Sequence, residues 1–247
     1  MDELITKLKA LIAESKHLVA FTGAGLSAES GIPTYRGTGG LWTKYDPMKY
    51  ANIHYFFEEP SYYWSFFRDI RYSLMQKAKP NPAHYALAEL EKRGKLIQVI
   101  TQNIDGLHQL AGHRNVVELH GNTRRIVCME CARQFSMEET YQRLKEVFPP
   151  TCVACGGRLK PDTVFFGEAL PQEAINAAIH ATENCDMVLV VGSSLVVYPA
   201  AQLPVGAKEN GARLAIVNLD VTPLDSIADV VIHKSASTVL PRLIQEE

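Results

Sequence analysis

Short apolar runs recur along the chain, each bounded by glycine or polar residues. Six of them have the length and composition of buried parallel strands: Leu18–Thr22, Ile97–Thr101, Val116–Leu119, Met187–Gly192, Arg213–Asn218 and Val230–Ile232. Other segments repeat apolar residues at helical spacing, which predicts helices over Met1–Lys16, Ala83–Lys92, Glu173–Thr182 and around Ala200–Asn210. This alternation predicts an α/β fold, with a doubly wound parallel sheet covered by helices on both faces.

Two stretches interrupt the alternation. The segment 37–79 is rich in aromatic residues and predicts irregular structure with short helices, and the segment 124–160 carries two pairs of cysteines. We find no internal repeat and no low-complexity linker. The simplest interpretation is one doubly wound domain with two insertions that build a smaller lobe.

Composition narrows the classes of function. The 247 residues are 47% hydrophobic and 21% charged, which is typical of a globular protein. A net charge of −2 does not support a strongly basic surface for nucleic-acid binding, although it is compatible with a local basic patch. No apolar stretch approaches the roughly 18 residues that a membrane helix needs. The amphipathic N-terminal segment lacks the apolar core of a signal peptide, so we expect a cytoplasmic protein with reduced cysteines.

A glycine-rich segment, Phe21–Gly31, directly follows the first predicted strand. Gly23 and Gly25 allow a tight turn and close backbone approach to a phosphate. Ala28 stands where the usual dinucleotide fingerprint has its third glycine, and no second strand with an acidic end follows about 20 residues later. A pyrophosphate-binding turn is therefore favoured over an ordinary dehydrogenase site, and a turn that serves packing alone is the alternative.

Four cysteines form two C-x-x-C pairs: Cys128 with Cys131, and Cys152 with Cys155. Two such pairs can close a tetrahedral Zn²⁺ site, and four thiolates leave no open position for catalysis. Between the pairs, Ser136 and Glu139 form a capping box, which predicts a helix over Met137–Val147. We expect one structural zinc ion, the alternatives being unconnected thiols or a redox pair.

Polar residues cluster where several predicted strands end, which is where open α/β sheets bind ligands. Asn103 and Asp105 follow the second strand, and His120 lies in Glu118–Gly121 after the third. Gly192–Ser194 and Asn218–Asp220 end two later strands. His120, as a histidine at a strand end, has an ordinary pKa near neutrality and so could act as a general base. Taken singly, the segment with Asn103 and Asp105 could equally be a turn cap, and Gly192–Ser194 or Asn218–Asp220 would be interpreted as turn residues. A single histidine is more often a satisfied or solvated imidazole than a base.

In chain order, these motifs resemble the sirtuins, the NAD-dependent protein lysine deacylases. The matching segments are Gly23–Gly37, Thr101–Asp105, Glu118–Gly121, the four cysteines, Val164–Glu168, Gly192–Ser194 and Asn218–Asp220, in a compact chain similar to bacterial and archaeal members. The resemblance implies a Rossmann-like NAD-binding domain formed by residues 1–36, 80–123 and 161–247. It also implies a small domain formed by a helical module, 37–79, and a zinc ribbon, 124–160.

The resemblance further assigns residues to each ligand. NAD⁺ would contact Gly23, Ala24, Gly25, Ala28, Tyr35, Arg36, Gln102, Asn103, Ile104, Asp105, His120, Gly192, Ser193, Ser194, Asn218, Leu219, Asp220 and Ala236. An acetylated protein or peptide lysine would contact two segments that pair with its backbone as strands: Val164, Phe165, Phe166, Gly167 and Glu168, and Val196, Val197 and Tyr198. The family usually has Phe where this chain has Tyr35, which retains the ring and adds a hydroxyl.

The family's reaction gives His120 a role. The acetyl-lysine carbonyl oxygen attacks C1′ of the ribose as nicotinamide leaves, and a neutral imidazole then deprotonates a ribose hydroxyl. The resemblance therefore implies a catalytic group of His120, Asn103 and Asp105, with free lysine, nicotinamide and acetyl-ADP-ribose as products. The alternatives are a protein ADP-ribosyltransferase or longer-chain deacylase using the same site, and a non-catalytic NAD-binding or zinc-ribbon interaction module.

The acyl group can also be considered from the resemblance. Sirtuins that prefer succinyl or malonyl lysine carry a Tyr-x-x-Arg pair in the helical module, and the corresponding positions here are Arg68 and Arg71. We expect both arginines on a solvated helix face and an apolar acyl pocket. Deacetylation should then exceed desuccinylation, because a buried carboxylate would be poorly paired.

Overall fold

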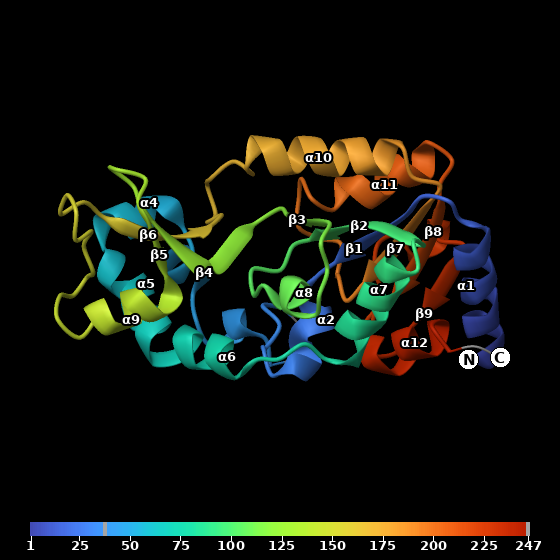
Figure 1. Cartoon of the computed structure of the whole chain (residues 1–247), viewed down its shortest axis with the longest axis horizontal. Helices are drawn as coiled ribbons and strands as arrows, with labels where there is room; N and C mark the ends of the chain where they lie inside the picture. The colour runs from blue at the N-terminus through green and yellow to red at the C-terminus, as the bar shows by residue number, and fades with distance from the viewer. Residues whose placement is uncertain (37–38, 246–247) are drawn as a thin grey trace.

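The centre of the molecule is a six-stranded parallel sheet; the computed structural model describes residues 1–36 and 39–245. The strands are β1 (Leu18–Thr22), β2 (Leu96–Thr101), β3 (Val116–Glu118), β7 (Met187–Val191), β8 (Arg213–Val217) and β9 (Val230–Ile232). Their spatial order is β3-β2-β1-β7-β8-β9 (Figure 1). The chain thus winds outward from β1 and β7, which is the Rossmann order and predicts a ligand crevice where these two strands end.

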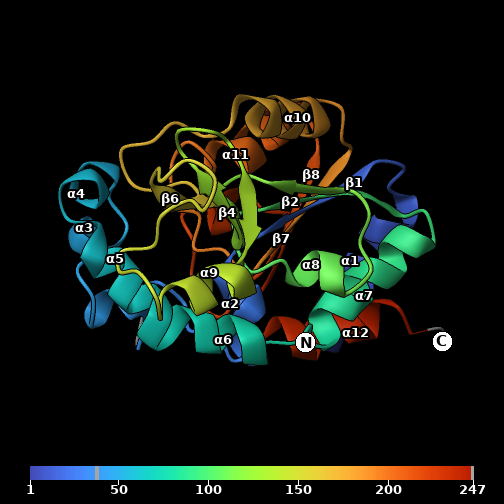
Figure 2. The same ribbon diagram turned by 60° about the vertical axis from the view of Figure 1, so that its left-hand side comes forward.

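Helices cover both faces of the sheet (Figure 2). One face carries α1 (Asp2–Glu14), α7 (Pro82–Lys92) and α12 (Ala236–Leu243), and the other carries α10 (Gln172–Glu183) and α11 (Gln202–Glu209). Both faces of β1, β7 and β8 are buried apart from Arg213 at the start of β8, which explains why these strands read as continuous apolar runs.

The six strands confirm the predicted fold class, and each lies within one residue of the predicted bounds. The predicted strand over Met187–Gly192 ends at Val191 because Gly192 has a left-handed backbone, with φ +62°. Within the described residues, no helix is both long and apolar enough to cross a membrane. The predicted boundary at Gly37 and the last two residues of the chain, Glu246 and Glu247, lie outside the described residues.

The two insertions lie together at one end of the molecule, on the left of Figure 1. The first forms α3 (Pro47–Tyr50), α4 (Ile53–Glu58), α5 (Pro60–Phe66), a π-helical turn (Phe67–Arg71) and α6 (Tyr72–Lys77). The second carries an antiparallel sheet of β5 (Gln134–Ser136), β4 (Gly121–Cys128) and β6 (Leu159–Thr163), together with α9 (Met137–Arg143). Trp64 and Phe67 from the first insertion pack with Ile126 and Leu159 from the second, so both share one apolar core.

The helix after the first cysteine pair is shorter than predicted. The Ser136–Glu139 capping box is present, with backbone-to-side-chain distances of 3.1 and 2.7 Å. The prediction of a helix to Val147 was wrong, because α9 ends at Arg143 and the chain continues in tight turns. The Arg143 guanidinium donates to the carbonyl of Thr151 at 2.6 Å, which draws the chain back toward the second cysteine pair.

Candidate active site

A cleft of about 1060 Å³ opens where the strands of the large sheet end and extends toward the small lobe. Its walls contain every residue that the resemblance assigns to NAD⁺ or to the peptide, except Asp105. Residues that were not assigned also line it, among them Trp42, Tyr50, Tyr63 and Arg71 from the helical module. The cleft therefore brings together segments from both lobes.

The glycine-rich turn is fitted against the end of β7. The amide of Gly23 donates to Val191 O at 3.0 Å and that of Gly25 donates to Gly192 O at 2.8 Å. A Cβ at Gly192 would lie 2.1 Å from the amide nitrogen of Leu26, so a side chain cannot be accommodated without moving the backbone. The short helix α2 (Ala24–Ser27) starts in this turn. Gly23, Gly25 and Gly192 are thus required for this packing, and the packing places the backbone of the turn at the wall of the cleft.

Side chains after β2 link this turn to its neighbours. Gln102 Nε2 donates to Ser193 Oγ at 2.8 Å, and Asn103 Nδ2 donates to Gly23 O at 3.0 Å. Asp105 lies behind the wall, 4% exposed, where it accepts from Ser27 Oγ at 2.7 Å and from the Leu107 amide at 2.8 Å. Burial raises its pKa, although these hydrogen bonds oppose the shift. Asp105 therefore holds the turn in shape rather than facing the cleft.

His120 lines the cleft with one ring nitrogen already engaged. Its Nδ1 lies 3.0 Å from Gln102 O. Because a backbone carbonyl can only accept, Nδ1 carries the proton and Nε2 is left with its lone pair. Burial lowers the pKa of His120, and the bond to Gln102 only partly opposes this. The imidazole is thus neutral near pH 7 and able to accept a proton.

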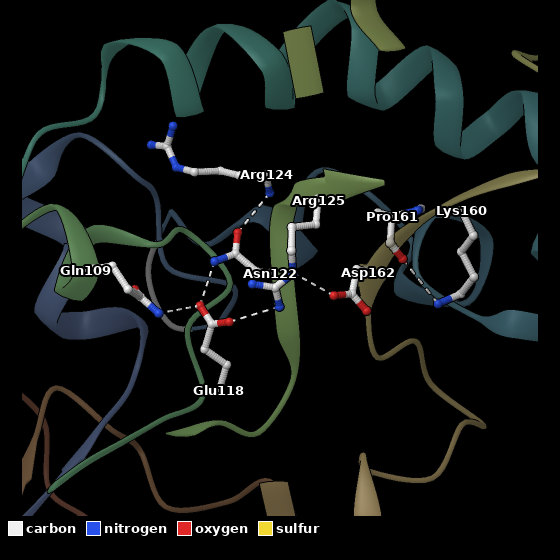
Figure 3. Close-up of polar contacts among 8 residues, drawn as sticks. All are labelled: Gln109, Glu118, Asn122, Arg124, Arg125, Lys160, Pro161 and Asp162. Atoms are coloured by element: carbon white, nitrogen blue, oxygen red, sulfur yellow. Dashed lines mark hydrogen bonds and ion pairs between the residues drawn. The ribbon is translucent and has the colours of Figure 1, made fainter. Parts of the chain in front are cut away.

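The chain on either side of His120 is held by a polar network (Figure 3). Glu118 accepts from Gln109 Nε2 at 2.9 Å, from Asn122 Nδ2 at 2.6 Å and from Arg125 at 3.0 Å. Arg125 also donates to Asp162 on β6 at 2.8 Å. These contacts join the ends of β3, β4 and β6, and so fix the turn that carries His120.

The two segments expected to contact a peptide face the cleft in irregular conformations. The amide of Val164 donates to His120 O at 3.0 Å, which places the first segment beside the histidine. Phe166 forms an isolated bridge with Asn52 in the helical module. Val196 and Tyr198 in the second segment are 48% and 67% exposed.

The four cysteines gather as the spacing predicts. Their sulfur atoms all lie within 4.8 Å of one another, with Cys128 Sγ 3.5 Å from Cys155 Sγ and Cys131 Sγ 3.7 Å from Cys152 Sγ. This arrangement fits a tetrahedral zinc ion with four thiolate ligands. Cys185 lies far along the chain, half-buried between α10 and β7, and bonds to Thr182 O.

The expectation of two solvated arginines was wrong for Arg71. Arg68 is exposed and pairs with Asp69 at 2.6 Å, whereas Arg71 is only 6% exposed and lines the cleft. The π-helical turn that ends at Arg71 changes which side chains face inward, and sequence periodicity gives no signal of such a turn. Arg71 donates to Tyr35 Oη at 3.2 Å and lies over the ring of Phe66 at 5.1 Å.

Comparisons with known proteins agree with this geometry. The Sir2 family model matches residues 23–199. The "NAD-dependent protein deacylase 2" of Archaeoglobus fulgidus is 49% identical over 247 residues, covering 100% of this chain and 97% of the relative. The "NAD-dependent protein deacetylase" of Sulfurisphaera tokodaii is 48% identical over 239 residues, covering 96% and 94%. A solved structure of a Sir2 variant with a deacetylated p53 peptide and 3′-O-acetyl ADP-ribose has a TM-score of 0.92 at 39% identity, covering 97% of each chain. The chain belongs to the Sir2 family.

Proposed function

We propose that this protein is an NAD⁺-dependent protein lysine deacetylase that transfers the acetyl group of a modified lysine to ADP-ribose and releases nicotinamide. The observation that carries the proposal is the position of His120. Its Nε2 is free to accept a proton, and it lies between the glycine-rich turn and the peptide segments at the cleft. The relatives' names and the ligands in the solved Sir2 structure support the same reaction.

NAD⁺ would be held where the large sheet ends. The turn of Gly23–Gly25 would face its pyrophosphate, and the ends of β7 and β8 would face its adenosine half. In this co-substrate, nicotinamide is the leaving group and ADP-ribose is the acceptor. Gln102 and Asn103, fixed by their bonds to Ser193 and Gly23, would line the ribose next to the nicotinamide.

His120 would accept the proton of a ribose hydroxyl at Nε2. The Gln102 carbonyl holds the ring in the required tautomer, and the same bond stabilises the imidazolium that forms. Val164, bonded to the carbonyl of His120, would bring the acylated lysine to the same point. Asp105 would contribute to catalysis indirectly, because its bond to Ser27 fixes the short helix that follows the glycine-rich turn.

The zinc ion would be structural. Cys128, Cys131, Cys152 and Cys155 would supply four thiolates, which leave no position for a substrate. We also propose the large domain as residues 1–36, 80–123 and 161–247, with 37–79 and 124–160 forming the small domain. A cytoplasmic location is part of the same proposal, since thiolate ligands suit a reducing compartment.

One observation favours a second, wider activity: removal of acyl groups that end in a carboxylate. Arg71 and Tyr63 are both buried at the cleft, and Arg71 Nε and Tyr63 Oη have no hydrogen-bond partner among the described residues. No described carboxylate pairs with Arg71. A buried guanidinium beside an unsatisfied hydroxyl group is a site that an anion would complete.

Matched acetyl and succinyl versions of one peptide would test the wider activity. We expect Arg71→Met to lower kcat/KM for the succinyl peptide by about tenfold or more, because a charged hydrogen bond is lost. The acetyl reaction should change much less. Arg68→Met, at an exposed neighbour, is the control and should alter neither. If wild-type protein shows no succinyl removal, the wider activity is wrong while the deacetylase proposal stands.

Labelled NAD⁺ would separate the deacetylase from the transferase. The protein is incubated with an acetylated protein substrate and NAD⁺ labelled in the adenosine. A deacetylase leaves the label in a small molecule as acetyl groups disappear. Label that becomes attached to protein without acetyl loss would contradict the proposal and favour an ADP-ribosyltransferase.

A further inference from the structure

A buried lysine on β6 has no part in the chemistry proposed above. Lys160 is 9% exposed, and lysine is rarely buried to this extent unless its charge is paired. In the chain it lies between the second cysteine pair and the first peptide segment, Val164–Glu168. A buried ammonium group is costly to desolvate, so its partners indicate what it holds in place.

The partners of Lys160 all belong to the chain that leads into or forms the peptide segment. Its Nζ donates to Thr163 O at 2.6 Å. It also donates to Pro161 O at 3.4 Å, a contact drawn in Figure 3. It also pairs with Glu168 Oε2 at 2.9 Å and lies 4.5 Å from the centre of the Phe165 ring. One ammonium group thus contacts both Thr163, the residue just before the segment, and Glu168, its last residue.

Glu168 completes the loop around this charge. The oxygen that pairs with Lys160 also accepts from the Phe165 amide at 2.8 Å. The Glu168 amide in turn donates to Phe165 O at 3.0 Å, across a turn in which Gly167 has φ +91°. The segment is therefore folded around Lys160, in addition to its isolated bridge from Phe166 to Asn52.

The loop connects the two lobes at the cleft. Its first amide, that of Val164, bonds to His120 O, and the amide of Phe166 bonds to Ala51 O at 2.7 Å. Residues 163–168 all line the cleft, whereas Lys160 does not. A change in the loop would alter the part of the cleft proposed to bind the peptide. It should leave NAD⁺ binding unchanged, because the glycine-rich turn follows β1 and packs against the end of β7.

We propose that Lys160 is a positioning residue for the acylated peptide: its ammonium group, paired with Glu168, holds residues 163–168 in the shape that binds an acyl-lysine substrate. This inference deepens the proposed function and depends on it. Lys160 touches no substrate, so its effect should appear in peptide affinity and not in cofactor affinity.

The test compares Lys160→Met with Lys160→Arg. The dissociation constant of an acetylated peptide is measured without NAD⁺, and that of ADP-ribose is measured separately. We expect Lys160→Met to weaken peptide binding about tenfold, with ADP-ribose binding within about twofold of wild type. Lys160→Arg should recover part of the loss, because it retains the charge. Lys77→Met, at an exposed lysine of α6, is the matched control and should change neither constant.

Glu168→Gln is a second test that leaves the lysine in place. Loss of the ion pair should again weaken the peptide and spare ADP-ribose. Unchanged peptide affinity in folded Lys160→Met, or an equal loss of peptide and ADP-ribose binding, would overturn the inference and leave only a role in stability. Failure of wild-type protein to deacetylate any peptide in the presence of NAD⁺ would instead contradict the proposed function.

Discussion

His120 combines a fixed tautomer with a lowered pKa, and both follow from its position in the turn between β3 and β4. The bond to Gln102 directs the basic nitrogen toward the cleft, and burial disfavours the charged ring. A base of this kind works only in its neutral form. If His120 is the proposed base, its protonation state should set the acid limit of activity.

Replacing His120 by Ala should lower kcat by roughly 10²-fold or more, in line with the usual contribution of a general base. His180→Ala, at an exposed site on α10, serves as the control. Steady-state deacetylation of one peptide measures both variants. Near-normal turnover in His120→Ala would show that another group accepts the proton.

The pH profile of kcat/KM should also report His120. Because burial lowers its pKa below 6.5, activity should be constant near neutral pH and fall only as pH drops below that value. Protonation removes the lone pair of Nε2, so the loss is on the acid side. An acid limb centred above pH 6.5 would contradict the environment described for this ring.

Among the elements, the contact between the glycine-rich turn and the end of β7 leaves no room for a side chain at Gly192. Gly192 and Gly94 both have left-handed backbones, with φ +62° and +72°. A Cβ at Gly192 would meet the Leu26 amide nitrogen at 2.1 Å, whereas a Cβ at Gly94 would meet nothing within 4 Å. A side chain at either site would strain the backbone, but only at Gly192 would it also clash with a neighbouring segment.

Alanine at these two positions therefore separates strain from clash. Gly94→Ala should cost about 1 kcal/mol of unfolding free energy, the usual scale for such strain. Gly192→Ala should cost more and also weaken ADP-ribose binding, because the backbone of the cleft wall must move. Thermal unfolding and ADP-ribose titration check both. Equal effects of the two variants would show that the close approach is unimportant.

The sequence predicted some elements better than others for physical reasons. The strands of the large sheet are continuous apolar runs because both faces are covered, so their bounds could be predicted closely. The sequence could not predict on which side of the helical module Arg71 lies, because a π-helical turn shifts the helical register locally. Asp105 was assigned to the cofactor from its motif, but in the fold it lies behind the cleft wall and bonds to Ser27, 78 positions away in the chain.

At the scale of the whole molecule, the cysteine cluster and the segment proposed to contact the peptide, Val164–Glu168, share one core. Cys128 and Cys152 pack with Ile126, Leu159 and Phe165. Metal binding in such a site is coupled to folding. The large sheet has its own apolar layers on both faces. Loss of zinc should thus affect the two lobes differently.

Removal of zinc by a chelator should abolish peptide binding and unfold the small lobe, while ADP-ribose binding is retained in part. Cys131→Ala should do the same, and Cys185→Ser should leave the metal content unchanged. Metal analysis, circular dichroism and ligand titration follow these changes. A folded, active protein without zinc would contradict the structural role.

The motifs could be placed at strand ends from the sequence, but the shape of the cleft could not. Gln102 and Ser193 lie 91 positions apart in the chain. They meet because Gln102 follows β2 and Ser193 follows β7, and these two strands lie on either side of β1 in the sheet. The loop around Lys160 depends likewise on contacts between the lobes. Distances of this kind come from tertiary packing, which local sequence patterns do not encode.

The most direct test of the central claim is product identification. An acetylated peptide is incubated with the protein, with and without NAD⁺, and every product is identified by mass spectrometry. We predict free-lysine peptide, nicotinamide and acetyl-ADP-ribose in equal amounts, and only when NAD⁺ is present. Loss of acetyl without NAD⁺, or its release as free acetate with no acetyl-ADP-ribose formed at any time, would contradict the account.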